Sequence, residues 1–189
     1  DMKTLLYMIL LGGFLLRIYY VMAAPYNITV HDIGDFYGLN TEQTGGGHLG
    51  YVDYIFKNNK LPDFDPRSRW SFYNPPGFYV LEAIILKITL LFPVPEPLCY
   101  ESLQVTTYFF SSVTIWMGYR ILKEFSIGEK WLLLLMGLLS LHPFFAIMSV
   151  TLTNDAMTMF FMTLAIWYTI RWQKTPSVKN IVILAIGLG

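Results

Sequence analysis

This 189-residue chain is poor in charged residues and has a single cysteine. Only 14% of its residues are charged, against about 25% in a typical soluble domain, while 54% are hydrophobic. The single cysteine, Cys99, excludes a framework of intramolecular disulfides. Lys plus Arg and Asp plus Glu number 13 each, so no net charge favours nucleic acid, and we expect no such partner. The shortage of charge instead predicts several segments that lie in lipid.

Long apolar runs recur along the chain and predict an all-α fold, a polytopic transmembrane helical bundle. About 20 apolar residues span a bilayer as a helix. The predicted spans are residues 4–24, 103–122, 131–150 and 156–172, with another beginning at 181. Since residues 181–189 are too short to cross, we interpret 1–189 as a single truncated transmembrane domain from a longer protein. A cleaved signal peptide is the alternative for the first run, but Arg17 and the bulky residues after it suit cleavage poorly.

Residues 25–102 form a long loop between the first two spans, and this loop is expected to contain juxtamembrane helices. This loop is too polar to span the membrane, and it is too rich in aromatic residues to be a plain linker. Apolar side chains at helical spacing predict a short amphipathic helix in the membrane interface, ended before Pro62. Its apolar side is Leu49, Val52, Ile55 and Phe56, and its polar side is Asp53, Lys57 and Asn58. A second helix is predicted from Pro76 to Phe92.

Basic residues suggest how these spans are oriented, because Lys and Arg favour the cytoplasmic side. They flank three places: the N-terminus, residues 120–130 and residues 171–179. All three places are cytoplasmic only if the helix of residues 76–92 does not cross the membrane. The loop 25–102 and the turn 149–155 then face the same outer compartment.

Four acidic or imidazole side chains are candidates for chemistry on that side. His31, Asp32 and Asp35 follow the first span closely, and carboxylates beside an imidazole suit a general base or a metal site. A solvated polar turn is the alternative. Asp155 opens a predicted span, where the helix dipole favours a carboxylate. Plain capping by Thr153 or Asn154 would explain that position equally well.

Five further residues are candidates for binding a substrate. Tyr73 and Asn74 precede the Pro-Pro step, where a helix N-terminus suits a phosphate. Simple helix initiation is the alternative. Arg67 and Arg69 lie just upstream and could pair with a phosphate, although interfacial Arg often only reaches lipid headgroups. His48, in a glycine-rich stretch without the context of a nucleotide loop, is a candidate metal or substrate contact.

The order of these motifs resembles the GT-C superfamily of glycosyltransferases that use polyprenyl-phosphate sugars. The closest resemblance is to its protein O-mannosyltransferase and aminoarabinose transferase branch. The matching stretches are residues 31–35, 47–62, 72–76 and 141–155. The family's usual His-Pro-Pro-Leu step is here Asn74-Pro75-Pro76-Gly77, a departure at the expected contact to the lipid phosphate.

The resemblance implies an inverting transfer of sugar from a polyprenyl-phosphate donor on the extracytoplasmic side. Asp32 matches the acidic residue after the first span, Asp35 competes for that role, and Asp155 matches the second acidic position. Some branches of the superfamily use a divalent cation and others do not; if this chain uses one, the candidate ligands are Asp32 and Asp155. The protein would be integral to a plasma membrane or endoplasmic reticulum, with this fragment inactive alone. The alternatives are a transporter or flippase fragment, and a membrane scaffold without catalysis.

Overall fold

The computed structural model describes residues 1–26, 34, 39 and 45–189. The described part of the chain is all helical, with 73% helix and no strand, which confirms the all-α prediction. The chain divides into two compact units. Unit 1 comprises Asp1–Tyr20, Tyr108–Ser149 and Asp155–Gly189, and unit 2 comprises Val21–Thr107 and Val150–Asn154.

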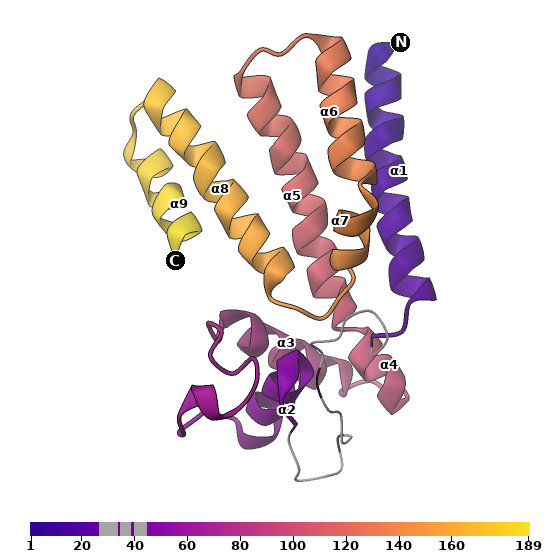
Figure 1. The fold of residues 1–189 in the computed structure, drawn as a ribbon, viewed down its shortest axis with the longest axis vertical. Helices are drawn as coiled ribbons and strands as arrows, with labels where there is room; N and C mark the ends of the chain where they lie inside the picture. The colour runs from indigo at the N-terminus through magenta and orange to yellow at the C-terminus, as the bar shows by residue number, and fades with distance from the viewer. Residues whose placement is uncertain (27–33, 35–38, 40–44) are drawn as a thin grey trace. The chain divides into compact units, whose positions relative to one another are not determined.

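Unit 1 is built from all or most of six helices, drawn in Figure 1. They are α1 (Met2–Ala23), α5 (Gln104–Glu124), α6 (Glu129–Leu141), α7 (Pro143–Met148), α8 (Asp155–Lys174) and α9 (Val178–Leu188). One apolar cluster joins α5, α6 and α7 through Ile115, Met136 and Phe145, and side chains of α1 pack against it. A second cluster, with Met117 and Trp167 at its centre, joins α5, α8 and α9.

The helices agree only in part with the predicted spans. Among the described helices, α1 alone is both long and apolar enough to cross a membrane, while α9 is apolar but short. The helices α5 and α8 are 21 and 20 residues long, but they are less apolar than α1. The polytopic arrangement therefore remains a proposal.

The single helix predicted over residues 131–150 is wrong, because the structure breaks it at His142. The helix α6 ends at Leu141, and α7 starts at Pro143, which has no N–H to continue the hydrogen-bond ladder. His142 adopts φ −59° and ψ 117°, and its Nδ1 accepts a hydrogen bond from Phe145 N at 3.4 Å. His142 thus caps α7 instead of continuing α6.

The helices α1 and α6 approach closely at Gly13. A Cβ atom placed on Gly13 would lie 2.8 Å from Ser140 Cβ and 2.9 Å from Ser140 O. Small residues that let two backbones meet are typical of helix contacts within membranes. The contact also brings the Arg17 side chain, one turn further along α1, to the C-terminal end of α6.

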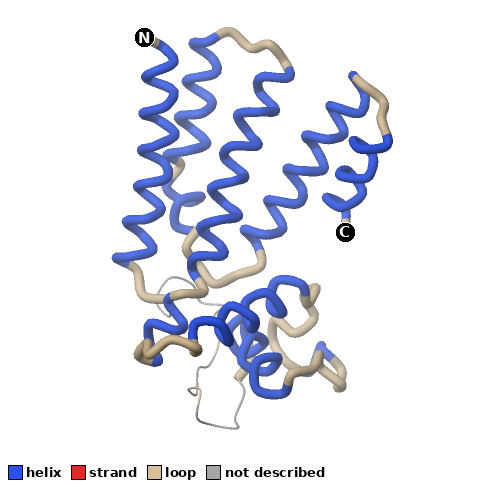
Figure 2. Tube along the Cα trace, turned by 180° about the vertical axis from the view of Figure 1, so that it is seen from behind, coloured by secondary structure: helices blue, strands red, loops and turns tan. Residues whose placement is uncertain are grey.

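Unit 2 contains α2 (Gly47–Asn58), the 3-10 turn η1 (Pro66–Ser68), α3 (Gly77–Thr89) and α4 (Glu96–Glu101), joined by the tan loops of Figure 2. The predicted helices over residues 49–58 and 76–92 are thereby confirmed as helices. The end of α2 is set by Asn59, which adopts the left-handed conformation (φ 53°) and donates its N–H to Ile55 O.

Of the three residues predicted on the polar side of α2, Asn58 is exposed and Lys57 is half-buried, but Asp53 is buried. Asp53 was expected on the solvent side, yet it is only 1% exposed, and every residue from Gly47 to Ile55 is buried. The aromatic residues of the long loop explain why. The Tyr51 ring stacks on Phe72 and on Tyr79 with centroid distances of 4.4 and 4.2 Å. These rings form an aromatic core in unit 2 that joins α2 to α3.

Candidate functional site

The acidic cluster closest to the first helix lies outside the described residues, since His31, Asp32 and Asp35 all belong to ranges not described. Two described residues that flank this cluster, Tyr26 and Leu39, form hydrogen bonds with side chains of α4. The Glu101 carboxylate accepts the Tyr26 N–H at 3.1 Å, and the Glu96 carboxylate accepts the Leu39 N–H at 2.7 Å. The roles of His31, Asp32 and Asp35 therefore stay predictions from the sequence.

Two of the predicted binding residues, His48 and Asn74, meet at the hydroxyl of Tyr79. His48 Nδ1 lies 2.8 Å from Tyr79 Oη, and Asn74 Nδ2 donates to the same oxygen at 3.0 Å. His48 is buried, Tyr79 is fully buried and Asn74 is half-buried. The His48 ring also stacks on Tyr79 at 5.8 Å. Tyr79, which sequence analysis missed, organises this polar cluster at the edge of the aromatic core.

We expect Tyr79→Phe to weaken unit 2. The substitution keeps the ring stack but leaves His48 and Asn74 without the oxygen that joins them, a loss of about 1–3 kcal/mol for buried polar groups. Labelling of the buried thiol of Cys99, which is the chain's single cysteine, provides the measurement. A variant whose Cys99 stays protected to the same temperature as in the wild type would contradict this role. The exposed Tyr73→Phe is the matched control, expected to change nothing.

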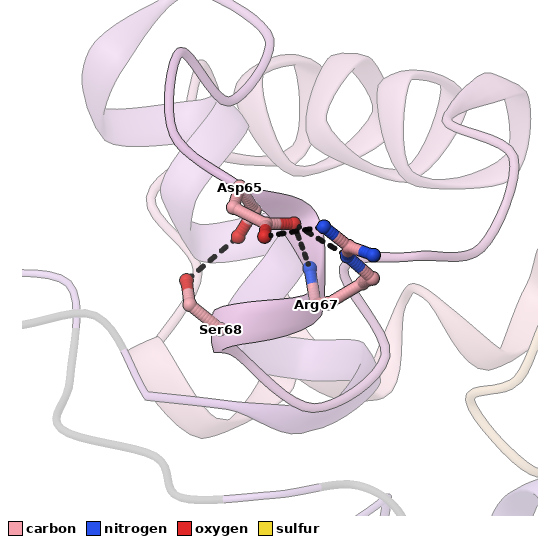
Figure 3. A network of polar contacts seen from close by, with 3 residues as sticks. All are labelled: Asp65, Arg67 and Ser68. Carbon is pink, nitrogen blue, oxygen red and sulfur yellow. Dashed lines mark hydrogen bonds and ion pairs between the residues drawn. The ribbon is translucent and has the colours of Figure 1, made fainter.

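Arg67 and Arg69 both have partners within unit 2. The guanidinium of Arg67 pairs with the Asp65 carboxylate through two contacts, Nε–Oδ1 at 3.0 Å and Nη2–Oδ2 at 2.9 Å, as Figure 3 shows. This pairing is on the surface and holds the turn η1, where Asp65 also accepts the Arg67 N–H. The Arg69 guanidinium lies 4.8 Å from the Phe64 ring centroid. Contact with a substrate phosphate remains a prediction for both.

A buried acidic group appears where the sequence predicted a solvent-facing one. Asp53 Oδ1 accepts a hydrogen bond from Tyr100 Oη at 3.3 Å, and Lys57 Nζ lies 3.5 Å from Oδ2. Burial raises the pKa of Asp53, and the Lys57 charge and the Tyr100 hydroxyl oppose that rise. Because this carboxylate is enclosed by its partners, it stabilises the contact of α2 with α4.

Asp155 lies at the rim of a large cavity in unit 1. It is the first residue of α8, as predicted, and its side chain is exposed. The cavity has a volume of about 640 Å³ and lies between α6, α7 and α8. Its polar lining comes from His142, Ser149, Asp155 and Thr158, and its apolar walls include Leu135, Leu138, Phe144 and Met159. The site thus places a carboxylate and an imidazole beside a space suited to an apolar chain.

A metal centre does not appear among the described residues, where no group of three or more His, Cys, Asp or Glu side chains could hold an ion. The sequence left open whether a divalent cation is used, with Asp32 and Asp155 as its candidate ligands, and that question stays open because Asp32 is not described. Comparisons with family models, with curated proteins and with solved structures found no match for the chain.

Proposed function

We propose that the chain belongs to a membrane glycosyltransferase that takes its sugar from a polyprenyl-phosphate donor. The cavity beside Asp155 carries this proposal. It offers about 640 Å³ of mainly apolar space, which suits an isoprenoid chain, and a carboxylate at its rim, where the polar head of such a molecule would lie. The acceptor is a hydroxyl or amine on a protein, lipid or glycan outside the cytoplasm.

The proposed reaction is a single displacement at the anomeric carbon. The acceptor oxygen or nitrogen forms the new bond to that carbon, while the bond to the phosphate oxygen breaks and the polyprenyl phosphate leaves with the electron pair. A carboxylate, Asp32 or Asp155, takes the acceptor's proton. The leaving phosphate needs stabilisation of its charge more than a proton. Attack from the face opposite the leaving group inverts the anomeric configuration.

Unit 2 supplies a second set of groups suited to a sugar. Trp70 and Tyr73 are large aromatic side chains that are 56% and 59% exposed, and rings of this kind stack on sugars and isoprenoids. Asn74, half-buried and bonded to Tyr79, brings an amide to the same segment. We propose that this segment contributes to binding the donor or the acceptor.

Substitution of the acids tests the proposal. In the full-length protein, Asp155→Asn and Asp32→Asn are each expected to lower sugar transfer while leaving expression unchanged. The substitution that removes the base should lower it at least 100-fold, since a positioned base contributes about 10²–10⁴-fold. Glu129→Gln is the matched control, because Glu129 is also exposed and also opens a helix but does not line this cavity. Equal transfer by all three variants and the wild type would remove both acids from the mechanism.

We further propose that the protein is a polytopic, integral membrane protein whose active site faces away from the cytoplasm. The apolar α1 and the three groups of basic residues support this topology. Cysteine-accessibility labelling of Ser126→Cys, between α5 and α6, tests it. The buried Cys99 contributes little background. Labelling only from the cytoplasmic side is expected, and labelling only from outside would contradict the topology.

A further inference from the structure

Arg17 is a fully buried cation in the apolar helix α1. Its Nη1 donates to two backbone carbonyls, Gly13 O at 2.9 Å and Ser140 O at 2.7 Å. The second oxygen lies in the last turn of α6, whose carbonyls lose their partners where Pro143 stops the helix. The guanidinium carbon also lies 4.8 Å from the Phe145 ring centroid. The break between α6 and α7 therefore accounts for the hydrogen bond from Nη1 to Ser140 O.

The other edge of this guanidinium has no hydrogen-bond partner among the described residues. Arg17 Nε and Nη2 are buried and make no hydrogen bond, and among the described residues no carboxylate forms an ion pair with Arg17. The Ser140 hydroxyl, on the residue whose carbonyl Arg17 binds, is also buried without a hydrogen-bond partner. Arg stays charged in proteins, and a buried charge without a partner is strongly unfavourable.

We propose that the Nε–Nη2 edge of Arg17 binds an oxyanion, a phosphate or carboxylate, with the Ser140 hydroxyl as a further donor. Nε and Nη2 point in parallel from one side of the guanidinium, the geometry that holds two oxygens of one anion at once. Such an anion would satisfy both unpaired nitrogens and neutralise the charge. An ionisable residue within an apolar helix is a candidate functional site for the same reason.

The position of Arg17 indicates two sources for the anion. Arg17 lies six residues before the end of α1 at Ala23, about 9 Å along the helix axis. Phe145, against which the guanidinium packs, also lines the cavity beside Asp155, while Arg17 itself does not line it. The same donors of Arg17 and Ser140 would bind a phospholipid headgroup or a free phosphate ion, so the experiment has to distinguish these two sources.

The test uses full-length protein in nanodiscs of phosphatidylcholine, with or without phosphatidylglycerol. Native mass spectrometry counts retained phosphatidylglycerol, and thermal unfolding in phosphatidylcholine alone, with and without inorganic phosphate, reports binding of the free ion. We compare the wild type with Arg17→Gln, Arg17→Lys and Ser140→Ala. The control is Arg120→Gln, which removes an exposed cation packed on Trp116 and Trp167.

We expect Arg17→Gln to abolish the anion-dependent retention or stabilisation, and Arg17→Lys to weaken it about tenfold because Lys lacks the paired N–H groups. Ser140→Ala should weaken it severalfold, and Arg120→Gln should not change it. Retained lipid identifies a headgroup, and stabilisation by phosphate alone identifies a free ion. The proposal is overturned if neither anion binds the wild type, or if anion binding is the same in the wild type, Arg17→Lys and Ser140→Ala. Those two variants decide the matter even if Arg17→Gln does not fold.

Discussion

Glu82→Met is expected to raise the stability of unit 2 by about 1–3 kcal/mol at pH 7, the usual penalty for a buried polar group without a partner. Glu82 lies in α3 with no exposed surface, and neither carboxyl oxygen makes a hydrogen bond among the described residues. Met fills a similar volume without polar oxygens. Protection of the Cys99 thiol against labelling on heating measures the gain. A variant less stable than the wild type would show that Glu82 has a partner that the structure does not describe.

The pH dependence of stability gives a second measure of Glu82. Burial raises its pKa well above the ordinary value of 4.5, and the nearby Thr106 hydroxyl opposes that rise without reaching hydrogen-bond geometry. The folded state therefore binds this proton more tightly than the unfolded chain does. This tighter proton binding stabilises the folded state fully below about pH 4.5. The stabilisation is lost as the pH rises from there towards the folded-state pKa of Glu82.

Glu82→Gln isolates this contribution, because it removes the titrating proton and keeps the shape. Asp53, whose pKa is also raised, contributes a dependence of the same sign in both proteins, so the difference between them belongs to Glu82. We expect the wild type to lose stability relative to Glu82→Gln as the pH rises above about 4.5, followed by circular dichroism. Parallel curves would contradict the raised pKa of this buried carboxyl.

Gly13→Ala is expected to destabilise unit 1 by about 1–3 kcal/mol, the usual penalty of overpacking a tight contact. The new methyl group would meet Ser140 Cβ at 2.8 Å and Ser140 O at 2.9 Å, and a backbone oxygen cannot move aside easily. The change would also disturb the carbonyls of Gly13 and Ser140 that Arg17 Nη1 binds. Tryptophan fluorescence during thermal unfolding reports on unit 1, because Trp116, Trp131, Trp167 and Trp172 lie there.

The neighbouring Gly12→Ala provides the matched control. Its methyl group would lie 3.9 Å from Leu141 Cδ2, an ordinary contact. Replacing Gly by Ala inside a helix otherwise stabilises it by about 0.5–1 kcal/mol. The two variants should therefore change stability in opposite directions. If Gly13→Ala is as stable as Gly12→Ala, α1 does not pack against α6 at this residue.

The sequence predicts the helices of this chain well where a single local signal decides them. The apolar run of α1, the 3.6-residue spacing of α2 and the Pro-Pro step before α3 each lead to the observed helix. The break at His142 was missed because hydropathy continues unchanged across it. The proline signal was present in the sequence, since Pro143 cannot donate the hydrogen bond that α6 would need.

The candidate site was harder to predict because its contacts join distant parts of the chain. His48 and Asn74 were identified as polar residues in an aromatic segment, but the Tyr79 hydroxyl that joins them follows only from the packing of α2 on α3. The burial of Asp53 was misjudged for the same reason, since helical spacing cannot show that aromatic side chains cover the polar side. Asp155 could be placed because helix starts and charge are both local signals.

Donor turnover by the full-length wild-type protein tests the central proposal most directly. The protein is incubated in detergent with a set of polyprenyl-phosphate sugars, and release of the polyprenyl phosphate is measured alongside the anomeric configuration of the product. The account predicts release coupled to transfer with inversion, and loss of both in Asp155→Asn. If no donor is turned over and a solute is instead transported across a membrane, the glycosyltransferase proposal is contradicted and the chain belongs to a transporter.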